Sequence, residues 1–203
     1  MERLGIFGGT FDPPHIGHLI LASEAACQLK LDRVLWILTP NPPHKPDQPI
    51  TPVADRIEMV NAAIHGNPLF TLHDVDLQRS PPHYAVDTIK ILRDQINDED
   101  EFVYLIGGDS LENLPKWHKP ALLIQSVNLF GVLRRPGVTF NLSSLEMSLP
   151  GLLQKIGWIE APLVDISSSR IRLLVKDNGP FRYYVPEGVY NYICKHKLYQ
   201  FPA

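Results

Sequence analysis

Two histidines follow a small-residue turn near the start of the chain, and their placement predicts a phosphate site. Residues 8–18 read GGTFDPPHIGH, with an apolar run before them and apolar residues at helical spacing after them. This order predicts a strand, a turn and a helix N-terminus, where free backbone N–H groups and the helix dipole favour an anion. The glycines permit close approach of a ligand, and Thr10 adds a hydroxyl. His15 and His18 share one helical face, so both imidazoles are candidate donors to phosphate.

The histidine pair alone has other interpretations. His15 and His18 would also fit a helix cap and a solvated side chain. The two histidines could also bind zinc together with Asp12 or Asp109. An H-x-x-H pair without a third ligand at helical spacing is weak support for such a site. The turn has no G-x-G-x-x-G, and the sequence has no G-x-x-x-x-G-K-[ST]. We expect no metal site built from protein ligands alone.

Alternating apolar patterns predict the elements that position these residues. Short apolar runs indicate strands, and apolar residues at helical spacing indicate helices. Strands are expected at 4–7, 33–38, 69–72, 102–106, 127–133 and 156–159 with 163–164, and helices at 19–29, 53–64, 86–96, from within 165–172, and at about 187–195. Residues 136–150 have no assignable pattern. The alternation predicts an α/β fold with a Rossmann-like parallel sheet flanked by helices.

Polar segments follow the expected strands. In a parallel sheet the carboxyl ends of the strands share one edge, where ligands bind. These segments are 8–18, the proline-rich loop 39–52, Gly107-Gly108-Asp109, Arg134 and the serine-containing 165–172. We expect all of them at one edge of the sheet.

Length and composition restrict the class of protein. The 203 residues suit one domain, 1–203, with a C-terminal helical part at about 165–203 packed on it. A net charge of −3 gives no sign of a nucleic-acid surface, and no stretch approaches a membrane span. The N-terminus lacks a signal-peptide layout, and Cys27 and Cys194 have no paired spacing, so we expect a cytoplasmic protein with free thiols. The sequence leaves the oligomeric state open, with a homo-oligomer as one option.

The motifs together resemble one enzyme family. Residues 8–18 resemble the signature of nucleotidyltransferases related in fold to class I aminoacyl-tRNA synthetases. Adding PPHK at 42–45, GGDSL at 107–111, Trp117 and ISSSRIR at 166–172 makes the chain similar to bacterial nicotinate-nucleotide adenylyltransferases over nearly its whole length. That family transfers AMP from ATP to nicotinate mononucleotide, giving deamido-NAD and pyrophosphate, with Mg²⁺. The resemblance implies Mg²⁺ held mainly through the ATP phosphates.

The resemblance also implies roles for individual residues. His15, His18 and Arg172 would be catalytic. The ATP-binding residues would be Gly8, Gly9, Thr10, Phe11, His15, His18, Gly107, Asp109, Arg134, Ile166, Ser168 and Arg172. The nicotinate mononucleotide site would comprise Thr10, His44, Lys45, Ala85, Asp109, Trp117 and His118. Among the residue-level alternatives, Asp109 would cap a short helix at 111–114, and Trp117 would belong to the core.

One departure bears on the substrate. The family commonly has Thr at the position of Ala85, where a hydroxyl would lie near the pyridine carboxylate. Alanine cannot supply that bond, although backbone N–H groups around Trp117 and His118 would remain. The first alternative is therefore the same chemistry on nicotinamide mononucleotide. Phosphopantetheine adenylyltransferase, which shares the chemistry, and a nucleotide-binding regulator without catalysis are further alternatives.

Overall fold

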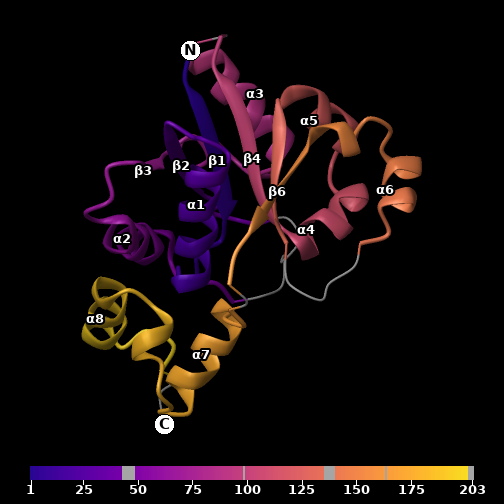
Figure 1. Ribbon diagram of the computed structural model, residues 1–203. Helices are drawn as coiled ribbons and strands as arrows, with labels where there is room; N and C mark the ends of the chain where they lie inside the picture. Colours follow the sequence, from indigo (N-terminus) through magenta and orange to yellow (C-terminus); the bar gives the residue numbers. More distant parts are fainter. Residues whose placement is uncertain (43–48, 98, 135–139, 163, 201–203) are drawn as a thin grey trace.

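A parallel six-stranded sheet forms the centre of the protein, in the strand order β3-β2-β1-β4-β5-β6 (Figure 1). The computed structural model describes residues 1–203 except 43–48, 98, 135–139, 163 and 201–203. The strands are β1 (Arg3–Gly9), β2 (Arg33–Leu38), β3 (Phe70–His73), β4 (Glu101–Gly107), β5 (Leu129–Arg134) and β6 (Ile156–Glu160). The order reverses between β1 and β4, which is where doubly wound sheets bind ligands.

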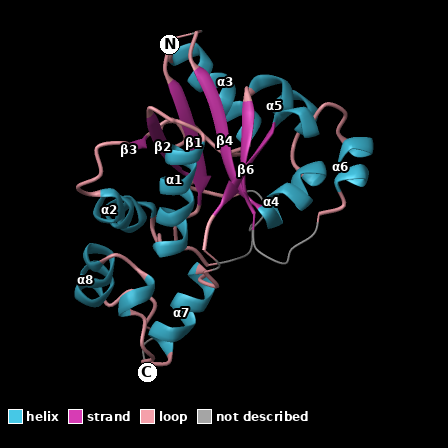
Figure 2. Cartoon of the chain, in the orientation of Figure 1, coloured by secondary structure: helices cyan, strands magenta, loops and turns pink. Residues whose placement is uncertain are grey.

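Helices cover both faces of this sheet (Figure 2). One face packs against α1 and α2, and the other against α3, α4, α5 and α6. The helices are α1 (Ile16–Gln28), α2 (Val53–Ile64), α3 (Ala85–Gln95), α4 (Gly108–Asn113), α5 (Pro120–Ser126), α6 (Leu142–Ser148), α7 (Ser168–Lys176) and α8 (Glu187–His196). Short 3₁₀ segments lie at Leu114–Lys116, Leu153–Lys155 and Arg182–Tyr184.

The apolar strand runs are explained by burial on both faces. Along β2, Trp36 packs in the core on the α1 side, whereas Leu35 and Ile37 pack in the core on the opposite side. A strand covered on both faces needs apolar residues at successive positions and not only at alternate ones. The expected Rossmann-like parallel sheet flanked by helices is therefore confirmed.

The C-terminal helices form a separate layer against α2. Met59 and Ala63 of α2 pack with Ile171 of α7 and with Val189 and Ile193 of α8. Helix α7 lies beyond the carboxyl ends of the strands, and α8 lies beside α2 (Figure 1). This arrangement brings Tyr199 to Asp12 in the first strand–helix turn.

Two helices were absent from the sequence-based expectations. Helix α6 lies in the region left unassigned, and it is short, with Leu145 its one buried residue. Helix α5 has only seven residues and follows a left-handed Lys119. Short helices with few inward residues give little periodic signal. Of the last expected strand region, 156–159 is confirmed, Val164 lies outside the strand, and Leu163 is outside the described residues.

Cys27 and Cys194 are both free, as expected, and both are exposed. Across the described ranges, we find no helix with the length and apolar character needed to cross a membrane.

Candidate active site

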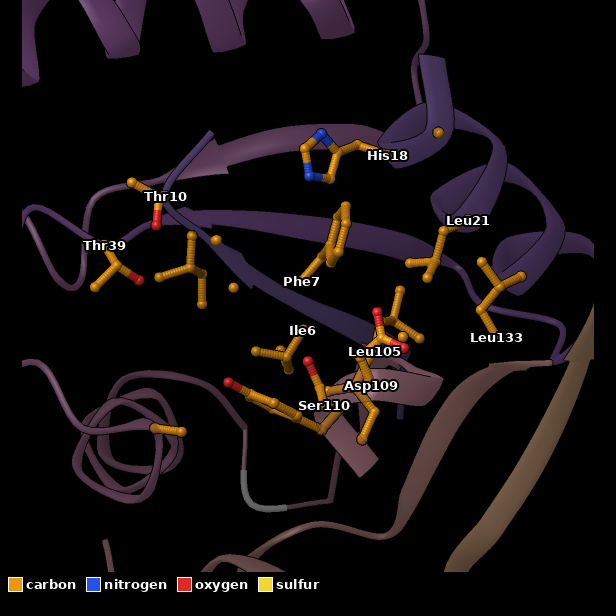
Figure 3. Close-up of a pocket in the computed structure, with 18 of the residues that line it drawn as sticks. Ile6, Phe7, Thr10, His18, Leu21, Thr39, Leu105, Asp109, Ser110 and Leu133 are labelled. Atoms are coloured by element: carbon orange, nitrogen blue, oxygen red, sulfur yellow. The ribbon is translucent and has the colours of Figure 1, made fainter. Parts of the chain in front are cut away.

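A cavity of about 860 Å³ opens at the carboxyl ends of β1 and β4. Its lining includes the residues after β1, the start of α1, the start of α4 and the segment before α7. In Figure 3, His18 lies on one side and Asp109 on the other, with Ile6 and Phe7 of β1 between them. Residues from 8–18, 107–109, Arg134 and 165–172 meet there as expected, together with Thr39 and Pro42 of the proline-rich loop, whose residues 43–48 lie outside the described part of the chain.

The two histidines at the start of α1 are coupled through the backbone. His15 is the N-cap residue, and its N–H donates to Nδ1 of His18 at 3.1 Å. The two rings stack with their centroids 3.7 Å apart. Because Nδ1 of His18 accepts this bond, the neutral imidazole carries its proton on Nε2 and is a donor there. The capping interpretation and the ligand-binding interpretation of this pair are therefore compatible.

Burial makes His15 a neutral residue. Its side chain is 7% exposed, and burial lowers its pKa from 6.5 to about 4. At neutral pH the His15 ring carries no charge, so it can act through hydrogen bonding and shape. Positive charge for a polyanion would have to come from other groups.

Phe11 is placed differently from the expectation. It was expected in the ATP site, but its side chain is 1% exposed and packs against Phe7, Trp36 and His18. Its φ of 49° folds the ring back over Gly9, where a Cβ would lie 2.8 Å from ring carbons. Phe11 therefore supports the site from the core, and Gly9 makes room for it.

The opposite side of the cavity is built on α4 and the segment after it. Asp109 lies in the first turn of α4, whose N-cap is Gly107, so the structure does not support the alternative cap role. Trp117 lines the cavity and meets Tyr104 edge to face, at 6.2 Å between centroids. His118 stacks on Tyr84 at 4.0 Å.

The expected site residues divide into three groups. Most line the cavity, namely Gly8, Gly9, Thr10, His15, His18, Ala85, Gly107, Asp109, Trp117, His118, Arg134, Ile166 and Ser168. Phe11 and Arg172 are not part of the lining. His44 and Lys45 lie outside the described residues.

Arg172 is engaged elsewhere in this structure. Its Nη1 donates to the carbonyl oxygen of Asp12 at 2.7 Å, and Nη2 donates to Ser169 at 3.3 Å. Ser168 does line the cavity, and its hydroxyl donates to the carbonyl of Pro13 at 2.9 Å. The N-terminus of α7 is capped by Ser167, whose hydroxyl accepts from the N–H of Arg170.

Sequence reasoning missed a buried arginine that organises the site. Arg56 of α2 is 1% exposed and donates to the carbonyls of Thr51, Thr10, Thr39 and Pro40 at 2.8–3.0 Å. It thereby fixes the turn after β1 relative to both ends of the loop after β2. A charged residue within the apolar period of a helix was the available signal, because such a residue is rarely buried without partners.

A second network supports the segment that leads into α3. The buried carboxylate of Asp76 accepts from the Thr88 hydroxyl at 2.8 Å and from Nε of Arg79 at 2.9 Å. Arg79 also donates to the carbonyls of Pro82 and Tyr84. These bonds fix the backbone just before Ala85.

Comparison with known proteins identifies the class that this fold and site define. The Cytidylyltransferase-like family model matches residues 6–174. The chain is 43% identical over 200 residues to a probable nicotinate-nucleotide adenylyltransferase of Thermomicrobium roseum, covering 98% of this chain and 92% of that protein. A Bacillus pumilus protein of the same name is 40% identical, over 98% of this chain and 100% of its own.

The chain therefore belongs to the cytidylyltransferase-like family of nucleotidyltransferases and, within it, to the nicotinate-nucleotide adenylyltransferases. A solved structure supports the fold independently. The Plasmodium falciparum nicotinic acid mononucleotide adenylyltransferase complexed with NaAD superposes with a TM-score of 0.82 at 19% identity, covering 100% of this chain and 99% of that one. The resemblance stated from the motifs is confirmed.

Proposed function

We infer that this enzyme transfers AMP from ATP to nicotinate mononucleotide, giving deamido-NAD and pyrophosphate, in NAD biosynthesis. The observation that carries this inference is the cavity at the β1–β4 reversal, which has His18 on one side and Asp109 with Trp117 on the other. Proteins 40–43% identical to it over nearly its whole length bear the name of this activity.

The reaction requires positioning more than proton transfer. A phosphate oxygen of the mononucleotide attacks the α-phosphorus of ATP, a new P–O–P bond forms, and the bond from that phosphorus to the pyrophosphate oxygen breaks. The attacking phosphate is already ionised at neutral pH, so no residue has to remove a proton from it. Catalysis then consists of alignment and of stabilising charge on the phosphates.

His18 is the proposed donor to the α-phosphate. Its Nδ1 accepts from the N–H of His15, and the tautomer that accepts there carries its proton on Nε2, the proposed donor atom. His15 remains neutral and buried beside it, and Gly8, Gly9 and Thr10 complete the phosphate cradle with Thr10 between the substrates. The N-terminus of α1 adds its dipole to this cradle.

Ser168 and Arg172 are the proposed contacts of the β and γ phosphates. Ser168 already lines the cavity, beside Ile166. Arg172 would have to release the carbonyl of Asp12 in order to reach a phosphate. Gly107 and Arg134 are proposed contacts of ATP, and Asp109 would accept from ribose hydroxyls.

Mg²⁺ would be held mainly by ATP oxygens and water. No group of three His, Cys, Asp or Glu side chains within the described parts of the chain is arranged to hold a metal ion. Mg²⁺ prefers oxygen ligands and commonly keeps substrate phosphates and water as its ligands. When bound, it would neutralise charge on the phosphates.

At the end of the cavity opposite the histidines, Trp117 would stack on the pyridine ring of the mononucleotide. The backbone at His118 would lie near the carboxylate of that ring. Ala85 lines this end without a hydroxyl. His44 and Lys45 are proposed for the mononucleotide phosphate on the resemblance alone.

The direct test is pyrophosphate release with ATP and Mg²⁺, comparing nicotinate and nicotinamide mononucleotides. We expect preference for the acid, and we expect His18→Ala to lower kcat by about 10²–10³, as for loss of one donor to a charged transition state. Preference for the amide would keep the mechanism and change the substrate. ATP binding without release from either would instead support a regulator.

A further inference from the structure

The C-terminal part of the chain makes a hydrogen bond into the turn that carries the histidines. The hydroxyl of Tyr199 donates to Oδ1 of Asp12 at 2.8 Å, across 187 positions of sequence. Asp12 lies three residues before His15, in the turn between β1 and α1. Tyr199 is therefore joined, through one acidic side chain, to the turn that leads into the proposed triphosphate site.

Each of the three oxygen atoms of Asp12 accepts a hydrogen bond. Its side chain is 4% exposed, and Oδ2 accepts from the N–H of Thr51 at 3.3 Å. Its carbonyl oxygen accepts from Nη1 of Arg172 at 2.7 Å. The next carbonyl, that of Pro13, accepts from Ser168. These partners come from the loop after β2, from α7 and from the C-terminal segment, so tertiary contacts determine the orientation of the turn.

Tyr199 is constrained to make its bond. It follows α8 in a left-handed conformation, with φ of 62°, which is unusual for a bulky residue and is retained only where surrounding contacts require it. Its side chain packs on the cluster around Met59. Burial and the neighbouring Asp12 raise its pKa, so the hydroxyl keeps its proton and stays a donor.

We propose that Tyr199 is a positioning residue for ATP, acting through Asp12 to hold the β1–α1 turn in the geometry that directs His15 and His18 at the triphosphate. The proposal rests on the proposed function, since that function places the triphosphate at this turn. The bond lies on the side of the cavity that carries the histidines, whereas Trp117 follows α4 and Ala85 begins α3 on the other side. Its loss should therefore affect ATP and spare the mononucleotide.

The same region offers a matched control. Tyr192 of α8 donates its hydroxyl to Oδ1 of Asp55 at 2.9 Å, and Asp55 is in the first turn of α2. Both tyrosines thus join the C-terminal part to the rest of the chain by one hydroxyl–carboxylate bond. Of these two bonds, that of Tyr199 reaches the turn and that of Tyr192 does not.

The experiment compares Tyr199→Phe and Tyr192→Phe with the wild type in melting temperature and in steady-state kinetics with each substrate varied separately. We expect Y199F to lower kcat/KM for ATP by about tenfold or more, because small misplacements of catalytic groups are costly. Its KM for nicotinate mononucleotide should stay within about twofold of the wild type, and Y192F should leave both substrates unchanged.

Three results would overturn the proposal: a folded Y199F with unchanged ATP kinetics, equal losses for both substrates in Y199F, or equal losses in Y199F and Y192F. A second measurement does not depend on activity. The imidazole NMR signals of His15 and His18 should shift in Y199F and not in Y192F, and unshifted signals would refute the proposal. A wild type that releases no pyrophosphate would refute the proposed function. The NMR comparison would still test whether the Tyr199–Asp12 hydrogen bond positions the two histidines.

Discussion

The two sides of the cavity are held in place by different forces. We call residues 8–18 the signature segment and residues 107–118 the facing segment. Hydrogen bonds from distant elements hold the signature segment, including those from Arg56, Tyr199 and Ser168. The facing segment is anchored by fully buried Leu111 and Leu114 and by the ring contacts of its aromatic residues.

This difference suits the two tasks of the site. Hydrogen bonds are directional, so they can orient donors toward phosphates to within a few tenths of an ångström. Apolar packing is non-directional and holds a surface in place without fixing each polar group. Changes to the signature segment should therefore affect chemistry and folding, whereas changes to the facing segment should mainly alter affinity for the mononucleotide.

The largest expected effect is from replacing Arg56, whose hydrogen bonds hold the signature segment to the loop after β2. Arg56→Met would leave four backbone carbonyls without their donor and would remove a buried positive charge close to Asp12, so we expect a loss of about 3–5 kcal/mol in the free energy of unfolding. Urea denaturation measures this. Arg33→Met, at an exposed ion pair with Glu2, should cost within about 1 kcal/mol. Similar losses of unfolding free energy in both variants would show that the hydrogen bonds of Arg56 do not hold the signature segment more strongly than a surface ion pair would.

The buried histidine of the signature segment predicts a pH dependence. The pKa of folded His15, about 4, lies below its unfolded value, so the unfolded chain binds the proton first as the pH falls. The stability from neutral His15 is complete above about pH 6.5 and is lost towards pH 4, about 2 kcal/mol of it by pH 5.

Denaturation curves of the wild type and His15→Gln between pH 7.5 and 5 would measure this contribution. The variant should lose less stability on acidification, because the other histidines titrate in both proteins. Parallel pH profiles for the two proteins would show that His15 is not held neutral by the fold.

A smaller effect is expected on the facing segment. Trp117→Ala should raise KM for nicotinate mononucleotide about tenfold through loss of ring stacking, with KM for ATP little changed. Trp117→Phe should recover part of that affinity. An equally large rise in KM for ATP would show that the two sides of the cavity do not bind the two substrates independently.

The smallest effect concerns substrate choice at the start of α3. Ala85→Thr would add a hydroxyl at the cavity, and we expect the ratio of kcat/KM for acid over amide to rise about three- to tenfold, the value of one hydrogen bond. Ala85→Val has the same shape without the hydroxyl and should not raise it. An increase with Val would assign the effect to shape.

Much of this architecture could be predicted because it is local. The apolar run of β2 was expected at 33–38 and is found at Arg33–Leu38, and the inward residues of α2 were expected from Val53 to Ile64. Period and run length report directly which face of an element is buried. Helices α5 and α6 were not predicted because they are too short to show a helical period of apolar residues.

What the sequence by itself determined is the strands and the longer helices, the β1–turn–α1 signature and the meeting of strand ends at one edge. These follow from spacing along the chain. Tertiary structure alone decided that Arg56 joins three segments, that Phe11 turns into the core, and that Tyr199 reaches Asp12. The physical reason is that a hydrogen bond across 187 residues depends on the path of the folded chain, which no local pattern encodes.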